Sequence, residues 1–367
     1  EITGILNGSN LSDSAVWPDM NQPFMLFFAR NRVPTAGHKF YFVTPHFERH
    51  LNDKGRVRID YQSAQPIAVS DIISDPDLLK TLAIGTSLDV EVVRKLDDLK
   101  WPTVKSHWES LEMYSGLGYN LSPKRDQSDA SFMRGLPNFS PPENDAFTVD
   151  SSLFPKFMHS SAHMPRCIEL YTPPLLVVPE SPGSSLVSPK SWILRKQTVF
   201  SSSYYGFSAN GNKDANLVLA LLHLLTHSEL FRYHVLMTSS KIGAERRSFL
   251  KANIESFPFP IIDNLSQQQY QTALDLSKQL ETASSKPWKA INNYIFKIYR
   301  LNEYDRQVVK DTLEVAAPYK EARDRANNVP SVDDRTEFYA ELQRLLTPSF
   351  ALTNEAISIE EVRIADQ

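Results

Sequence analysis

Three histidines are spaced so that a helix would place them on one face. His223, His227 and His234 lie at positions i, i+4 and i+11 of an apolar segment, and at about 100° per residue these positions share one side. Three imidazole rings on one stripe could bind zinc. No cysteine or carboxylate accompanies them at ligand spacing, however, and the HExxH pattern is absent. We therefore favour polar positions on a half-exposed helix face over a metal site.

A Gly-x-Gly pair offers a second candidate, a nucleotide-binding turn. The stretch YSGLGYN (Tyr114 to Asn120) contains the pair, but the following LSPKRDQSD opens no helix, as such a turn requires. The sequence also has no Walker lysine loop and no Gly-x-Ser-x-Gly elbow, and Cys167 has no ordered partner pattern. Neither a bound cofactor nor a covalent nucleophile is predicted.

Basic residues concentrate between Leu186 and Lys251. Nine basic and three acidic residues there give a local charge of +6 in a chain whose net charge is −4. Phosphate groups require such a patch, and hydroxyl groups and rings from SSSYYGFS (Ser201 to Ser208) could add contacts to sugar, phosphate or base. The alternative is a solvated rim with turn-forming serine and glycine, which composition alone slightly favours.

Several elements must position these residues. Apolar runs at 23–32 and 39–45 predict two strands, and NDKGR (52–56) predicts a turn. One or two helices are predicted over 75–96, with Asp75 or Asp77 and Thr86 or Ser87 as caps. Frequent prolines from Trp101 to about Gly183 indicate a mixed α/β domain with short strands. Strands are predicted in PLLVVP and SWILRKQTVFSS. The segment SSSYYGFS is expected to be a loop.

Helices dominate the rest of the chain. Residues 215–238 are leucine-rich nearly all round, which predicts one central helix capped by Asp214 or Asn212. A helix over 244–254 and a stop at SFPFP (256–260) follow. Amphipathic spacing then predicts further helices, with Asn302 and Asp333 or Asp334 as caps, and residues 356–365 alternate like a closing strand.

Composition is that of an ordinary globular chain. Of 367 residues, 41% are hydrophobic and 22% charged, so a sizeable core is expected and disorder is not. The single cysteine excludes an intramolecular disulfide and fits a reducing, cytoplasmic setting. No apolar run reaches membrane-spanning length, and no signal peptide is visible.

About sixty residues resemble a known family. The stretch from Tyr204 to Pro260 is similar to the end of the target-recognition domain of N6-adenine DNA methyltransferases with a fused specificity domain, as in type IIG restriction-modification and phage-defence methylases. The shared pattern is an aromatic-Gly-Phe segment, a leucine-rich helix, a serine-rich turn, a glycine, an ER..F motif and a Pro-x-Pro close. Upstream, PFMLFFARNRVP and FYFVTP resemble the last strands of the same family's catalytic domain, and LLKTLAIGTSLDVEVVRKL resembles the bridging helices.

The family's catalytic motifs do not occur in this sequence. The cofactor glycine motif is missing, and neither SPPE (Ser140 to Glu143) nor TPPL (Thr172 to Leu175) matches the Asn/Asp/Ser-Pro-Pro-aromatic tetrapeptide that would hold a flipped adenine. We therefore expect no cofactor in this chain, no S-adenosylmethionine binding and no methylation by it alone. The resemblance implies that a full-length enzyme uses S-adenosylmethionine to methylate adenine N6 at specific sites.

These observations predict a mixed α/β (α+β) chain with four regions. They are the end of a methyltransferase-like catalytic domain (1–74), a helical linker (75–100), a target-recognition domain (101–263) and a helical C-terminal region (264–367). The predicted function is sequence-specific recognition of double-stranded DNA together with an N-terminal catalytic segment or methylase subunit. The alternative is a protein-protein interaction module. The predicted DNA-binding residues are Arg195, Lys196, Ser203, Tyr204, Tyr205, Phe207, Lys241, Arg246, Arg247 and Lys251.

Overall fold

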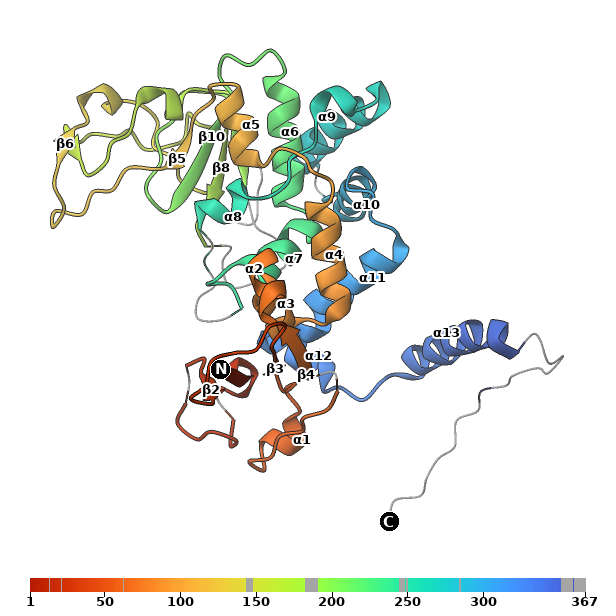
Figure 1. Cartoon of the computed structure of the whole chain (residues 1–367). Coiled ribbons are helices and arrows are strands. Elements are labelled where there is room, and N and C mark those ends of the chain that lie inside the picture. The colour runs from red at the N-terminus through yellow and green to blue at the C-terminus, as the bar shows by residue number, and fades with distance from the viewer. Residues whose placement is uncertain are drawn as a thin grey trace. The chain divides into compact units, whose positions relative to one another are not determined.

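The structure is a computed structural model. It describes residues 1–12, 14–20, 22–61, 63–142, 148–181, 191–243, 248, 250–283, 285–350 and 359. Two compact units divide the chain, Glu1–Arg323 and Asp324–Gln367. The predicted mixed α/β class is confirmed, because small sheets and many helices alternate through the first unit (Figure 1).

The first sheet has four strands in the order β2-β1-β3-β4. They are β1 (Ile2–Asn7), β2 (Met25–Ala29), β3 (Lys39–Val43) and β4 (Ala64–Ala68). β1 runs parallel to β3, and the other two pairs are antiparallel. The predicted strands at 23–32 and 39–45 are confirmed as β2 and β3, but β1 lies between them. The turn predicted over 52–56 follows the short helix α1 (Arg49–Asn52).

Helices cover one face of this sheet. After α2 (Val69–Ser74) come α3 (Leu78–Ile84), preceded by Asp77, and α4 (Ser87–Asp97), whose Thr86 cap accepts a hydrogen bond from the Leu88 N–H. The prediction of one or two helices is confirmed as two. Thr86 caps the second as predicted, whereas Asp77 stands before the first without a side-chain capping hydrogen bond. Apolar side chains of the sheet and the two helices share one small core, made of Ile5, Phe40, Phe42, Ile67, Leu78, Leu82 and Val90.

A second sheet forms the centre of the unit, in the antiparallel order β5-β10-β8-β9. It contains β5 (Ser115–Leu117), β8 (Leu175–Pro179), β9 (Trp192–Leu194) and β10 (Tyr204–Ser208), and α5 (Val104–Ser110) precedes it. The predicted strands in PLLVVP and SWILRKQTVFSS are confirmed as β8 and β9. A two-stranded ladder of β6 (Ser128–Asp129) and β7 (Ser161–Ala162) lies beyond β5, away from the helices (Figure 1).

The predicted single helix over 215–238 is wrong, because two helices occupy this segment. α6 (Ala215–Thr226) ends at His227, and α7 (Glu229–Thr238) starts again after Ser228, whose hydroxyl accepts a hydrogen bond from the Phe231 N–H at 3.1 Å. A serine that can cap a new helix outcompetes continuation of the old one. The predicted central position is confirmed, since every residue from Leu217 to Thr226 is buried.

The following helices pack onto the same core. α8 (Lys251–Glu255), α9 (Gln267–Thr282), α10 (Trp288–Ile298), α11 (Glu303–Asp311), a π-helical turn (Thr312–Ala316) and α12 (Lys320–Ala326) continue the chain. Leu280 and Ile295 of this region share a core with Leu222 and Phe207, so packing runs across the predicted boundary at residue 263. Asn302 caps α11 as predicted, accepting a hydrogen bond from the Asp305 N–H at 2.9 Å. The four-region division itself stays a prediction.

The second unit contains α13 (Val332–Phe350). Ser331 precedes it and accepts a hydrogen bond from the Asp334 N–H, so the capping side chain is Ser331, not Asp333 or Asp334. The strand predicted over 356–365 lies outside the described residues except for Ile359. Within the described part of the chain, no helix combines the length and apolar character needed to cross a membrane.

Candidate nucleic-acid interface

The segment expected to be a loop is a strand at the centre of the second sheet. β10 pairs with β5 on one side and β8 on the other, so Tyr204–Ser208 is framed by backbone hydrogen bonds. Successive side chains of a strand point to opposite faces. Tyr205 and Phe207 therefore enter the main core beside α6, with 5% and 0% exposure, and Tyr204 packs on Phe139 across the other face. The loop prediction is wrong because aromatic and β-compatible residues here follow a period of two.

Burial excludes the rings of Tyr205 and Phe207 from contact with a ligand at the surface. Phe207 packs edge-to-face against Trp108, with ring centroids 5.6 Å apart. Burial also raises the pKa of the Tyr205 hydroxyl to about 12. Side chains in these positions stabilise the sheet and reach no ligand at the surface of the folded protein. Within the predicted set, Ser203 is exposed and Tyr204 is half-buried.

The glycines of this region serve close packing. A Cβ atom on Gly206 would lie 2.2 Å from the Phe200 ring, and one on Gly118 would lie 2.1 Å from the Phe200 carbonyl oxygen. Phe200 thus crosses two neighbouring strands at points where only glycine leaves room. Gly118 of YSGLGYN and Gly206 of the aromatic-Gly-Phe pattern therefore both leave room for Phe200, whereas Gly116 faces Leu170.

Arg195 forms an ion pair with a carboxylate inside the protein. Its Nη1 and Nη2 atoms lie 2.6 and 2.9 Å from the two carboxylate oxygens of Glu281 on α9. The side chain of Glu281 is only 9% exposed, and this hydrogen bonding raises the pKa of Arg195. A bidentate pair of this kind fixes the guanidinium. Arg195 therefore joins β9 to α9, while its neighbour Lys196 is exposed.

The remaining predicted cations are placed as follows. The Lys251 ammonium lies 2.5 Å from Glu255 and 3.4 Å from the Ser115 hydroxyl, so it belongs to a local network at the start of β5. Lys241 follows α7 and is half-buried. Arg246 and Arg247 lie outside the described residues. Among the described residues, no contact joins Arg195, Lys241 and Lys251 into a single patch.

A different group of cations gathers around β6 and β7. We call residues 121–138 and 153–166 the basic lobe. Their two segments run side by side through backbone hydrogen bonds, such as Ala130 N–H to Ser160 and Gly135 N–H to Phe157. Met133, Phe157 and Ala162 anchor the lobe in a second core beneath the sheet. The lobe contains five basic and two acidic residues, a net charge of +3, and residues 151–168 contain no acid at all.

Four of the five cations of the basic lobe are exposed, whereas Arg166 is half-buried and donates to the Leu117 carbonyl oxygen at 2.9 Å. Lys124, Arg125 and Lys156 are exposed and form no ion pair with any carboxylate among the described residues. Large apolar side chains are exposed beside them, with Phe132 at 40%, Met158 at 62% and Met164 at 45%. Cations, hydroxyls and apolar side chains on one exposed lobe match the contacts that proteins make with phosphates, sugars and base edges.

Sequence reasoning missed the basic lobe because its charge is split between two stretches about thirty residues apart. Each stretch alone carries a small excess, whereas the window from Leu186 to Lys251 collected a larger one. The acid-free run from Ser151 to Ile168, with Lys156, His159, His163 and Arg166, was the available signal. Pairing of β6 with β7 could not be anticipated from two-residue strands.

The histidine stripe is buried, so the expectation of a half-exposed face is wrong. His223 bonds to the Ser277 hydroxyl at 3.0 Å, and the His227 ring accepts the Ser191 N–H at 3.1 Å. Burial lowers the pKa of His227 to about 3 and that of His234 to about 4, and lowers that of His223 well below its ordinary value. Among the described residues no group of three potential ligands could hold a metal ion.

Comparison with solved structures gives distant similarity for this chain. No family model matches the sequence, and no curated protein matches it. The solved structure of the type IIG restriction endonuclease BpuSI is similar with a TM-score of 0.36 and 7% sequence identity, over 84% of this chain and 43% of that one. The chain therefore spans less than half the length of the restriction endonuclease to which it is similar.

Proposed function

We propose that this chain binds double-stranded DNA through the basic lobe. The observation that carries the proposal is a run of eighteen residues, 151–168, that contains no acid and the exposed Lys156. It is paired to a second stretch with the exposed cations Lys124, Arg125 and Arg134. Duplex DNA carries a dense line of phosphates, and cations without internal partners are free to neutralise them. Lys124, Arg125 and Lys156 meet this condition better than Arg195 and Lys251, which contact carboxylates.

The proposal includes a division of labour within the target-recognition region. The buried sheet with Tyr205 and Phe207 would hold the lobe rigid, and a rigid binding surface loses less conformational entropy on association. Lys196 and Ser203, exposed at the ends of β9 and β10, remain candidate contacts at the edge of the sheet. Lys241, Arg246 and Arg247 stay predicted contacts.

The finer function rests on the resemblance in sequence. We propose that the chain is the specificity part of an adenine-N6 DNA methyltransferase of the restriction-modification kind, acting with a catalytic segment or subunit that supplies the S-adenosylmethionine site. Supporting residues are the ordered motifs from Tyr204 to Pro260 and the strand and helix motifs before them. The missing cofactor and Pro-Pro-aromatic motifs support a recognition role in place of a catalytic one.

Salt-dependent binding tests the proposal. Fluorescence anisotropy with a labelled duplex library, measured at several salt concentrations, should give a slope of log K against log salt close to −0.9 per phosphate contact. Binding without salt dependence, or no binding at low salt, would refute it. Calorimetric titration of the chain with S-adenosylmethionine should show no saturable site, and a saturable site would contradict the recognition-only role.

A protein-binding role is the second candidate, and one observation favours it. α13 exposes large apolar side chains along its length, with Val332 at 67%, Phe338 at 61% and Leu345 at 57%. Exposed apolar side chains on an amphipathic helix are typical of a surface that another protein covers. Sedimentation analysis of the chain and of a Phe338→Ser variant separates the two candidates. A protein-binding role predicts that the variant associates less with other protein molecules, while its affinity for DNA stays unchanged.

A further inference from the structure

Two large apolar side chains of the basic lobe are exposed, although their neighbours in sequence are buried. Phe132 and Met158 are 40% and 62% exposed, whereas Met133 and Phe157 beside them are 0% and 1% exposed. The buried neighbours pack in the second core and fix the backbone there. Phe132 and Met158, which we call the apolar pair, are therefore presented to solvent on a rigid support.

Backbone hydrogen bonds place the apolar pair on facing segments. The Ala130 N–H donates to the Ser160 carbonyl oxygen at 2.8 Å, and the Gly135 N–H donates to the Phe157 carbonyl oxygen at 2.8 Å. The exposed phenylalanine lies in a 3₁₀ turn (Ser131–Met133) between these two contacts on one segment, and the exposed methionine lies between them on the other. Both side chains thus belong to one short stretch of the basic lobe.

Exposed cations flank the apolar pair on both segments. Arg134 follows the exposed phenylalanine by two residues, and Lys156 precedes the exposed methionine by two. The acids of the lobe, Asp126 and Asp129, both precede the 3₁₀ turn. Asp129 accepts hydrogen bonds from the Ser131 N–H and hydroxyl at 3.1 and 2.9 Å, so its carboxylate belongs to the start of this turn. The nearest charges along the chain beyond the turn and beside the methionine are therefore positive.

An apolar pair between two cations suits a bent duplex better than a straight one. On a straight duplex the cations would meet phosphates, and the apolar side chains between them would stay in water. Proteins that kink DNA insert apolar side chains such as phenylalanine and methionine between base pairs, while cations hold the phosphates on either side. Insertion removes apolar surface from water, which offsets part of the cost of unstacking the bases.

We propose that Phe132 and Met158 insert between stacked base pairs and bend the duplex that the basic lobe binds. This inference rests on the proposed DNA-binding function and adds deformation of the DNA to it. Pyrimidine–purine steps such as TA unstack easily, whereas A-tracts are stiff. The chain should therefore favour a duplex with a TA step at its centre over a duplex with an A-tract at that position.

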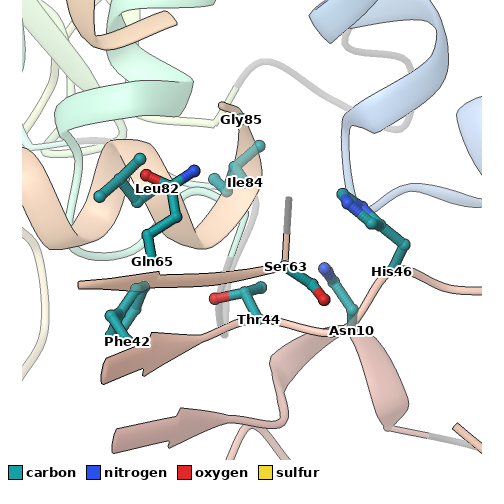
Figure 2. Close-up of a pocket in the computed structure, with 9 residues that line it drawn as sticks. All are labelled: Asn10, Phe42, Thr44, His46, Ser63, Gln65, Leu82, Ile84 and Gly85. Carbon is teal, nitrogen blue, oxygen red and sulfur yellow. The ribbon is translucent and has the colours of Figure 1, made fainter. Parts of the chain in front are cut away.

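The first sheet supplies a matched control for the apolar pair. Met25 and Phe27 of β2 are 50% and 63% exposed, so side chains of the same two types face solvent outside the basic lobe. Figure 2 shows the pocket of this sheet beside Asn10, Thr44 and Ser63. Its volume of about 10 Å³ leaves room for no more than one water molecule, and no lysine or arginine lines it. Neither a base nor a phosphate fits in this pocket.

Fluorescence energy transfer between the two ends of a labelled duplex of about 25 base pairs tests the proposal. Binding of the wild type should raise the energy transfer of the TA duplex. In a Phe132→Ala, Met158→Ala double variant this rise should disappear, and affinity for the TA duplex should fall about tenfold, roughly the effect of one stacked base. The salt slope should stay unchanged because the cations remain. A Met25→Ala, Phe27→Ala variant should match the wild type in all three quantities.

The possible failures are distinguishable. A wild type without salt-dependent duplex binding would contradict the proposed function and the bending together. Salt-dependent binding without a rise in energy transfer, or an unchanged rise in the Phe132→Ala, Met158→Ala variant, would overturn the bending alone. The same loss in the control variant would overturn it too. A lower melting temperature of the lobe variant would indicate a packing role, and weaker self-association with unchanged DNA binding would identify a protein contact; either result would also overturn the proposal.

Discussion

The central sheet and the basic lobe belong to one region of the chain but use similar residue types in opposite ways. In the sheet, Tyr205 and Phe207 are buried and Arg195 is paired with Glu281. In the lobe, Phe132 and Met158 are exposed, and Lys124 and Lys156 form no ion pair within the described residues. Aromatic and basic residues therefore indicate a binding surface only where the fold leaves them without internal partners.

Removal of an aromatic ring should give the largest difference in stability between a variant in the central sheet and a variant in the basic lobe. Phe207→Ala should lower the free energy of unfolding by about 3–5 kcal/mol, because it leaves a cavity beneath Trp108. Phe132→Ala, at 40% exposure, should change it by less than about 1 kcal/mol. Urea unfolding followed by circular dichroism measures both. Equal losses would mean that the lobe is packed as tightly as the sheet.

Acid should destabilise the protein through two histidines of its core. In the unfolded chain histidine titrates near its ordinary value of about 6.5, whereas His234 in the fold has a pKa of about 4 and His227 one of about 3. Between the folded-state and unfolded-state pKa values, the unfolded chain binds more protons than the folded one. The free energy of unfolding that these histidines contribute is therefore fully present at neutral pH and decreases as the pH falls below about 6.5.

The size of this pH effect can be measured with one variant. Within this pH range, each buried histidine changes the free energy of unfolding by up to about 1.4 kcal/mol per pH unit. His234→Phe, which keeps a ring against Phe257, should reduce the slope of stability against pH by about one proton. Thermal melts from pH 7.5 to pH 5 decide the matter, and an unaltered slope in His234→Phe would contradict burial of a neutral ring.

Glycine substitutions test the close approach around Phe200. Gly206→Ala should destabilise the protein by about 1–3 kcal/mol, because the new methyl group would meet the Phe200 ring at 2.2 Å. Gly4→Ala in β1 is a matched control, since its nearest neighbour would lie at an ordinary 3.5 Å. Differential scanning calorimetry of both variants should show a clear loss only for Gly206→Ala. A loss of the same size in both would point to a general cost of alanine in strands.

Arg195 and Lys196 are neighbours in sequence, so the stability losses of their alanine variants can be compared at nearly the same position. Arg195→Ala leaves the largely buried Glu281 carboxylate without its bidentate partner and should cost roughly 1–2 kcal/mol, reduced by the exposure of the guanidinium. Lys196→Ala should cost less than about 0.5 kcal/mol. Restoring stability in an Arg195→Met, Glu281→Leu double variant would confirm that the single loss comes from the isolated carboxylate.

Local sequence features predicted much of the fold. Apolar runs predicted β2, β3 and β8, and capping residues such as Thr86 and Asn302 predicted helix starts, because strands and caps depend on neighbouring residues. β10 was mistaken for a loop because serine and glycine suggested a turn, whereas its conformation depends on Phe200 and on strands far away in sequence. The break at Ser228 was missed because leucine periodicity continues across it.

The candidate site was less predictable than the fold. Whether a cation is free depends on where distant carboxylates fall, and Glu281 lies 86 residues from Arg195. Charge counts along the sequence favoured Arg195 over Lys124 and Lys156, although of these three only the two lysines form no ion pair within the described residues. Spatial pairing of 121–138 with 153–166 decides the location of the basic lobe, and short irregular strands carry little sequence information about it.

The most direct test of the account compares two triple variants with equal loss of charge. Replacing Lys124, Arg125 and Lys156 in the lobe by alanine should weaken duplex DNA binding at every sequence and reduce the magnitude of the salt slope by about 2–3. Replacing Lys289, Lys297 and Arg300 on and just after α10 should leave both quantities near the wild-type values. Equal losses in the two variants, or none in the lobe variant, would contradict the claim that the basic lobe is the DNA-binding surface.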